Sequence, residues 1–177
     1  MTLKLKPHTT YYYAAGSTVS LERTDEIGVD LDVARAATLD PDIVADLEAQ
    51  GRLLRRSLIM LDTADISPQV VKQLESAGAV RPVYTTEDGI TLVVLPEVRV
   101  EVSSKSEEQK LRQFLESSDV NAEILQQRPQ QLTVMLDSAK GADALRLANT
   151  IEEELHPAMS QARFIRILPG PGIKRSA

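Results

Sequence analysis

The chain has 177 residues, of which 42% are hydrophobic and 3% aromatic, so it can form one domain or two small ones with aliphatic cores. It contains no cysteine, which excludes disulfides, thiolate metal sites and a cysteine nucleophile. The net charge of −6 argues against nonspecific nucleic-acid binding, and no stretch approaches the ~20 apolar residues of a membrane span or resembles a signal peptide. We therefore expect a cytoplasmic protein with no nucleic-acid or membrane partner.

The first half of the chain predicts a hairpin followed by alternating strands and helices. Tyr11 to Tyr13 and Val19 to Leu21 flank the turn residues Gly16 and Ser17, which is typical of a small hairpin. Helices are expected to begin at Asp40-Pro41 and Ser67-Pro68, because Asp or Ser caps free N–H groups and proline fits the first turn. Strands are expected at 27–32, 57–62, 80–84 and 90–95, with a short one near 52–56.

The pattern restarts after residue 95. Residues 98–102 alternate as a strand does, and a capping box starts a helix at Ser104 with Glu107 or at Ser106 with Gln109. Two hairpin strands, a helix and a closing strand are then expected at 122–125, 132–136, 142–155 and 162–168. The closing strand cannot continue through the prolines and glycines that follow it.

A short internal repeat links the two halves. Residues 57–64 and 132–139 share the pattern Met-Leu-Asp-(Thr/Ser)-Ala, and each copy precedes a helix and a strand. Either duplication or chance likeness of two similar folds explains it. The element order β-α-β-β-α-β in each copy predicts an α+β fold of two tandem ferredoxin-like modules, with antiparallel sheets and helices on one face. The expected division is an N-terminal segment 1–10, modules at 11–90 and 91–168, and a flexible tail 169–177.

Residues suited to catalysis are sparse. His8 lies near the N-terminus, and His156 lies at a helix end, where a cation suits the helix dipole. There is no nucleophile elbow, phosphate-binding loop or metal-ligand spacing. We therefore expect a non-enzymatic protein with no catalytic residue, no metal site and no cofactor.

Charge is unevenly distributed along the chain. Residues 22–48 carry nine acidic residues and two arginines, whereas residues 158–177 carry four basic residues and no acid. The basic C-terminal region is either solvated surface or a docking segment for an acidic partner or for the acidic region of this chain.

Two segments resemble the propeptide of bacterial subtilisin-like serine proteases. They are Leu95-Pro96-Glu97-Val98-Arg99-Val100, and residues 132–167, in which an Ala-Asn pair lies on the helix and Phe164-Ile165-Arg166 ends the last strand. The tyrosine-rich stretch 11–16 is similar to the opening of some such precursors. The chain departs from the family at Gln161-Ala162-Arg163, where the family often has Pro-Asn before Phe-Ile-Arg. The resemblance covers residues 90–168, implies a ferredoxin-like fold, and includes no catalytic domain.

The resemblance implies a stand-alone inhibitor or folding chaperone that binds a protease in trans. The sheet would pack on the protease, and the tail would enter the substrate cleft by strand addition. The tail is otherwise an ordinary chain end. The expected partner-binding residues are Phe164, Arg166, Leu168, Ile173, Lys174 and Arg175.

Two other functions stay open. The first is a protein-interaction adaptor or protease substrate in a bacterial signalling or defence pathway, for which Arg55 and Arg56 are the candidate cleavage region; they are otherwise an exposed strand end. The second is a ligand-sensing protein that holds a small molecule between its modules. The three tyrosines are either a binding patch or pack over the N-terminal module.

Overall fold

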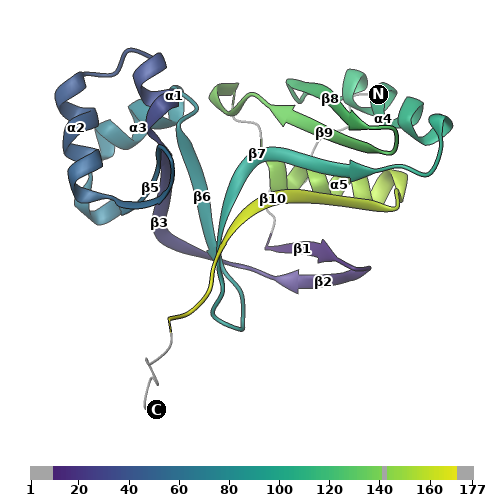
Figure 1. The fold of residues 1–177 in the computed structure, drawn as a ribbon, viewed down its shortest axis with the longest axis horizontal. Helices are drawn as coiled ribbons and strands as arrows, with labels where there is room; N and C mark the ends of the chain where they lie inside the picture. Colours follow the sequence, from purple (N-terminus) through teal and green to yellow (C-terminus); the bar gives the residue numbers. More distant parts are fainter. Residues whose placement is uncertain (1–9, 141–142, 171–177) are drawn as a thin grey trace.

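The computed structural model describes residues 10–140 and 143–170, and these residues form a mixed α+β fold with antiparallel sheets (Figure 1). The expected α+β class is therefore confirmed. Two groups of helices, at the left and right of Figure 1, are joined by strands that run between them. Within the described residues, one sheet has eight strands and a separate hairpin has two.

The first half of the large sheet contains four strands and three helices. They are β3 (Glu22–Asp30), α1 (Leu31–Ala36), α2 (Pro41–Gln50), β4 (Arg52–Arg55), β5 (Leu58–Asp62), α3 (Pro68–Ser76) and β6 (Val80–Thr85). The strand order is β4-β5-β3-β6, and each neighbouring pair is antiparallel. Val29, Ile59 and Leu74 form a core with the helices. The short strand expected near residues 52–56 is confirmed as β4.

The second half has a similar order of elements, with one helix where the first half has α1 and α2. Its elements are β7 (Thr91–Glu101), α4 (Lys105–Ser117), β8 (Ala122–Arg128), β9 (Gln131–Leu136), α5 (Ala144–Leu155) and β10 (Met159–Ile167). The strand order is β10-β7-β9-β8, again antiparallel. Val98, Leu132 and Ile151 lie in its core and are fully buried.

Strand β7 joins the two halves, and here the sequence-based prediction was wrong. Two separate strands were expected at 90–95 and 98–102, but Thr91–Glu101 is one strand. One edge of β7 pairs with β6 up to Val93 and with β9 from Glu97 onwards, so Pro96 lies between the two partners. A proline lacks the N–H that a central ladder requires, and a gap between partners removes that requirement.

The faces of the sheet differ in what covers them. Alternate β7 residues such as Leu92, Val94 and Val98 pack in the core beneath the helices of the second half. On β6, Val80 and Tyr84 point to this same face and pack with the cores of the first and second halves, respectively. The opposite face carries a separate apolar cluster, whose buried members are Leu58, Met60, Val83 and Val93.

The internal repeat has the same local structure in both copies. Asp62 ends β5 and its Oδ1 accepts the N–H of Ala64 at 2.9 Å; Oδ1 of Asp137, after β9, accepts the N–H of Ala139 at 3.1 Å. Each aspartate precedes a 3₁₀ helix, Thr63–Asp65 in the first copy and Ser138–Lys140 in the second. The shared Asp-(Thr/Ser)-Ala pattern therefore encodes a capped turn at the end of an equivalent strand.

The expected tyrosine hairpin is confirmed, but it packs elsewhere than expected. It consists of β1 (Tyr11–Ala14) and β2 (Ser17–Ser20), which are paired antiparallel. Instead of covering the first half, it lies against α5 and β10 of the second: the rings of Tyr12 and Phe164 are 5.0 Å apart, and Asn149 Nδ2 donates to Tyr11 O at 2.8 Å. The buried Asn149 and the partly buried Phe164 are distant from the hairpin in sequence, so the pattern of the hairpin itself could not reveal them.

The carboxylate of Glu153 binds two tyrosines of the hairpin and raises the pKa of Tyr11. The Tyr11 hydroxyl donates to Glu153 Oε1 at 2.5 Å, and the Tyr13 hydroxyl donates to the same oxygen at 3.1 Å. The hydrogen bond to Glu153 raises the pKa of Tyr11 well above its usual range, because ionisation would set a phenolate beside a carboxylate. The contribution of this bond to stability is therefore present below the usual tyrosine pKa and is lost as pH rises through the raised one.

We expect Tyr11 of the wild type to ionise above the usual tyrosine range in an ultraviolet absorbance titration. In Glu153→Gln this late ionisation should move towards the ordinary range, and in Tyr11→Phe it should disappear. Identical titration curves for the wild type and Glu153→Gln would contradict this account.

Candidate partner-binding site

Strand β10 is an edge of the large sheet. Within the described residues it pairs only with β7, through a register that shifts between Ala162 and Phe164. The hairpin of β1 and β2 lies against the middle of β10, where Gln161 Nε2 donates to Tyr13 O at 3.2 Å and the rings of Tyr12 and Phe164 are 5.0 Å apart. Beyond Phe164, no described strand pairs with the outer edge of β10. An open edge of this kind is a template for another strand.

A pocket of about 190 Å³ lies along β10. Gln161 and Arg163 point to one face of β10, and Ala162, Phe164 and Arg166 alternate with them. The side chain of Ala162 is buried in the core. We call it the edge pocket; its lining residues are Arg99, Met159, Gln161, Ala162, Arg163, Phe164 and Arg166.

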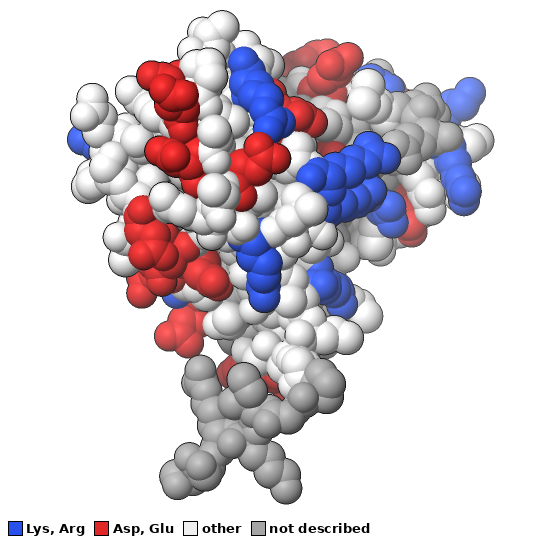
Figure 2. Space-filling view, turned by 60° about the vertical axis from the view of Figure 1, so that its left-hand side comes forward, with Lys and Arg blue, Asp and Glu red and all other residues white. Residues whose placement is uncertain are grey.

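The edge pocket is basic. It is lined by three arginines and by no acidic residue. Arg163 Nη1 donates to Glu97 at 2.7 Å, with 40% of its side chain exposed, while Arg99 and Arg166 are exposed. Figure 2 shows the wider pattern on one side of the molecule, where acidic side chains gather mainly on the left and basic ones towards the centre and right.

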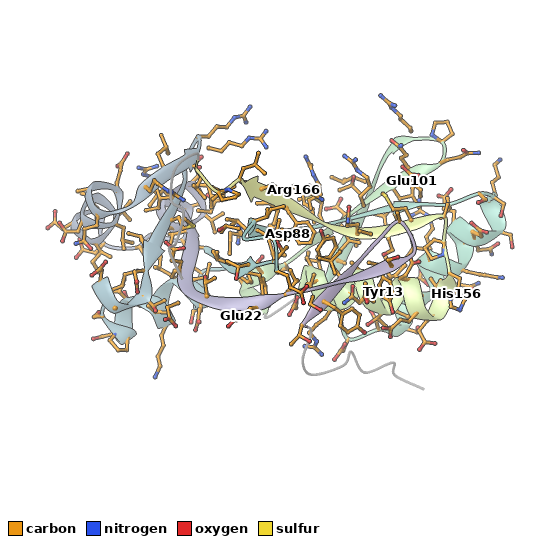
Figure 3. The ribbon with its side chains drawn as sticks, turned by 90° about the horizontal axis from the view of Figure 1, so that it is seen from below. Tyr13, Glu22, Asp88, Glu101, His156 and Arg166 are labelled. Atoms are coloured by element: carbon orange, nitrogen blue, oxygen red, sulfur yellow. The ribbon has the colours of Figure 1, made fainter. Side chains whose placement is uncertain are left out.

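Three of the expected partner-binding residues lie in or beside the edge pocket. Phe164 is partly buried against Tyr12, Arg166 is exposed, and Leu168 is 72% exposed just after β10. In Figure 3, Arg166 lies near the middle of the molecule, away from Tyr13 and His156. Ile173, Lys174 and Arg175 lie outside the described residues, as does His8.

The candidate cleavage region lies at another edge. Arg55 ends β4, and Arg56 forms the turn to β5 with a positive φ of 48°. Both arginines are exposed. Strand β4 is at the far end of the sheet path from β9 and β8, so these arginines do not belong to the edge pocket.

Sequence reasoning missed Arg99 and Arg163 as site residues. Arg99 lies on β7 directly opposite Gln161, and Arg163 lies at the register shift of β10. The alternation around Val98 and Val100 does place Arg99 on the uncovered face, which was a usable signal. The pairing of β7 with β10 was the missing information.

A larger hollow of about 480 Å³ lies between the halves, where β6 and β9 leave part of β7 unpaired. Its lining includes Arg81, Pro96 and Ala139. Arg81 Nη2 lies 3.4 Å from Asp30 Oδ2, and burial lowers the pKa of Arg81 while Asp30 opposes that shift. The hydrogen bonds of Arg81 to Gly78 O, Val80 O and Asp30 all lie within the first half, so Arg81 has a structural role there.

The described residues offer little for chemistry. No cluster of three or more histidine, cysteine, aspartate or glutamate side chains among them could hold a metal ion. No helix in this part of the chain is long and apolar enough to cross a membrane. His156 caps the end of α5 in the left-handed conformation, with its N–H donated to Glu152 O at 3.2 Å.

The fold and the edge pocket define an α+β protein with an arginine-lined pocket along its edge strand β10. No protein-family model, no curated protein and no solved structure matches the chain.

Proposed function

We propose that this protein is a non-enzymatic module that binds a protease in trans, as a propeptide-like inhibitor or folding chaperone. The observation that carries the proposal is the end of β10 beyond Phe164, where no described strand pairs with its outer edge and the chain leads directly to the exposed Leu168. Proteins that capture extended segments do so by pairing a strand with such an edge. The resemblance of residues 90–168 to subtilisin-like protease propeptides supplies the class of partner.

The strand orders support the proposal that the chain contains two tandem ferredoxin-like modules, within residues 11–90 and 91–168. The second half has the order β-α-β-β-α-β along the chain, and the first half has the same order with two helices, α1 and α2, in place of the first one. In each half the first strand lies between the third and fourth strands in the sheet, as in the split βαβ unit. A cytoplasmic location belongs to the same proposal.

The test is a titration of a subtilisin-like protease with the full-length protein, followed by hydrolysis of a small peptide substrate. We expect inhibition that weakens by about tenfold or more, roughly 1.4 kcal/mol, when the chain ends at Leu168, because the segment entering the cleft is then lost. A trypsin-like protease serves as the control of protease class. If neither version binds or inhibits the subtilisin-like enzyme, the proposal fails.

A second candidate function is that of a protease substrate or adaptor, favoured by the exposed Arg55 and Arg56 at a strand turn. Limited trypsin digestion separates the two functions. A single cut at this turn that releases a bound partner supports the substrate function. Resistance of the turn in the folded protein, with Arg56→Gln behaving as the wild type, contradicts it.

A further inference from the structure

We infer that the outer edge of β8 pairs with the same edge of a second copy of this chain, so that two molecules form a symmetric dimer with one continuous sheet. The inference is independent of the proposed protease binding, because β8 and β10 lie at opposite edges of the second half. It rests on three features of β8: an edge without a partner strand, an exposed leucine at its middle, and opposite charges placed symmetrically about that leucine.

Strand β8 is the last strand of the large sheet on the side of the second half (Figure 1). In the part of the chain that the structure describes, β9 is the only element whose backbone runs alongside it. The hairpin that lies against β10 does not reach β8, because it packs on α5 and β10. The outer edge of β8 is therefore a template for another strand.

The middle of β8 is an exposed leucine. Leu125 is the central residue of this seven-residue strand and is 42% exposed. Its partner on β9 is Thr133, which alternates with the core residues Leu132 and Val134 and so lies on the face without helices. A two-fold axis at Leu125 would set this side chain against its own copy and would pair the whole strand.

Two opposite charges lie at equal distances from Leu125 along the ladder. Glu123 is opposite Met135, and Arg128 is opposite Gln131, two β9 positions from the partner of Leu125 in either direction. Arg128 reaches this position because the register shift just before it leaves one extra residue on β8. Glu123, Leu125 and Arg128 therefore all lie on the same face of the sheet.

This symmetry makes the edge complementary to itself. Antiparallel pairing about Leu125 sets Glu123 of each copy opposite Arg128 of the other, and opposite charges directly across a strand pair stabilise it. Both side chains are exposed, and neither has an ion-pair partner within residues 10–140 and 143–170. A bulge and charges on an edge ordinarily discourage pairing with arbitrary strands. On β8 the same features select one occupant, a second copy of the chain.

The other end of the sheet does not fit a second copy. Leu53 on β4 is also exposed, but arginines stand at both ends of that strand and it carries no acidic residue. Self-pairing of β4 would gather arginines from both copies without a carboxylate to balance them, and like charges oppose such pairing. Strand β4 therefore provides the matched control.

The test measures the mass of the full chain by sedimentation equilibrium over a range of concentrations. One pair of seven-residue strands is a small interface, so we expect a reversible dimer with a Kd on the order of 10 μM. Leu125→Lys should weaken the dimer by about tenfold or more, because it sets two like charges on the axis. Leu53→Lys is the control on β4 and should leave the Kd unchanged.

Exchanging the two charges tests the register. Glu123→Arg and Arg128→Glu should each weaken self-association by about tenfold or more, because each gives the strand like charges at both positions. An equimolar mixture of the two variants should form a heterodimer about as tightly as the wild type, since every cation then meets a carboxylate. The double variant Glu123→Arg/Arg128→Glu should recover for the same reason. A variant that had failed to fold could not recover in the mixture.

The outcomes are decisive for this inference and separate from the protease function. A wild type that stays monomeric at its highest soluble concentration, single charge variants that dimerise as the wild type does, a mixture without a heterodimer, or loss of the dimer in Leu53→Lys would overturn the inference. Protease inhibition by a chain that is monomeric would leave the proposed function standing. A dimer with this charge dependence but no protease inhibition would remove only the proposed function.

Discussion

Replacing Gly78 with alanine is expected to lower the free energy of unfolding by about 2–4 kcal/mol. Gly78 follows α3 with a φ of +73°, a conformation that costs an alanine roughly 1–2 kcal/mol. A Cβ atom at this position would also lie 2.6 Å from the backbone nitrogen of Ala139 and 3.1 Å from its Cα. Because those atoms belong to the backbone of the second half, the clash can be relieved only by moving the two halves apart.

The matched control is Gly89→Ala, in the turn between β6 and β7. Gly89 has a similar φ of +79°, but no heavy atom lies within 4 Å of its added Cβ. Its alanine variant should therefore lose only the conformational cost of roughly 1–2 kcal/mol. Urea unfolding followed by circular dichroism measures both variants. Equal losses would show that the contact between Gly78 and Ala139 does not restrain the junction.

This contact bears on whether the halves unfold together. Strand β7 continues from the first half into the second. Strand β10 pairs with β7 on both sides of Pro96, so it spans the same junction. Small cores of this size are marginal when isolated, so shared strands and a close backbone contact favour one cooperative transition. If the Gly78→Ala variant separates the transitions of the two halves, its unfolding curve should become broader as well as earlier.

Local structure was largely predictable from the sequence. Asp40 Oδ1 accepts the N–H of Asp42 at 2.9 Å, and Ser67 Oγ accepts that of Val70 at 3.3 Å, so both expected helix starts are confirmed. Of the two capping boxes considered, Ser104 is the N-cap, and its Oγ accepts the N–H of Glu107 at 3.2 Å. Such caps depend on residues a few positions apart, which a sequence pattern displays directly.

Features that depend on distant residues could not be predicted. The continuity of β7 through Pro96 depends on where β6 ends and β9 begins. The packing of Tyr12 depends on Phe164, which lies on the last strand. The edge pocket combines Arg99 of β7 with β10, and Arg99 looked in sequence like an ordinary strand residue. Each of these depends on which strands become neighbours, and a period of two specifies only the face of a residue.

Asp30→Ala is expected to destabilise the protein by about 2–4 kcal/mol, because one carboxylate has two structural roles. Oδ1 of Asp30 accepts the N–H groups of Asp32 at 3.1 Å and Val33 at 3.2 Å, which caps α1. Oδ2 lies 3.4 Å from Arg81 Nη2, whose side chain is only 6% exposed. Loss of a cap costs ~1 kcal/mol, and removing one partner of a buried ion pair costs more because a buried charge remains.

The control for the cap is Asp40→Ala, since Asp40 caps α2 from an exposed position. The free energy of unfolding of Asp40→Ala, measured by the same urea unfolding, should be only ~1 kcal/mol lower than that of the wild type. If Asp30→Ala and Asp40→Ala lose the same free energy, the ion pair with Arg81 contributes nothing.

The double variant Asp30→Ala/Arg81→Met separates the attraction of the pair from the cost of an isolated charge. Arg81 also donates to Gly78 O at 2.7 Å and to Val80 O at 3.2 Å, so its guanidinium keeps two backbone partners when Asp30 is removed. Burial lowers the pKa of Arg81, which means that the surroundings disfavour the cation once the carboxylate is gone. Removing the cation as well should therefore restore part of the stability lost in Asp30→Ala. A double variant less stable than Asp30→Ala would instead assign the larger role to the bond between Arg81 and Gly78.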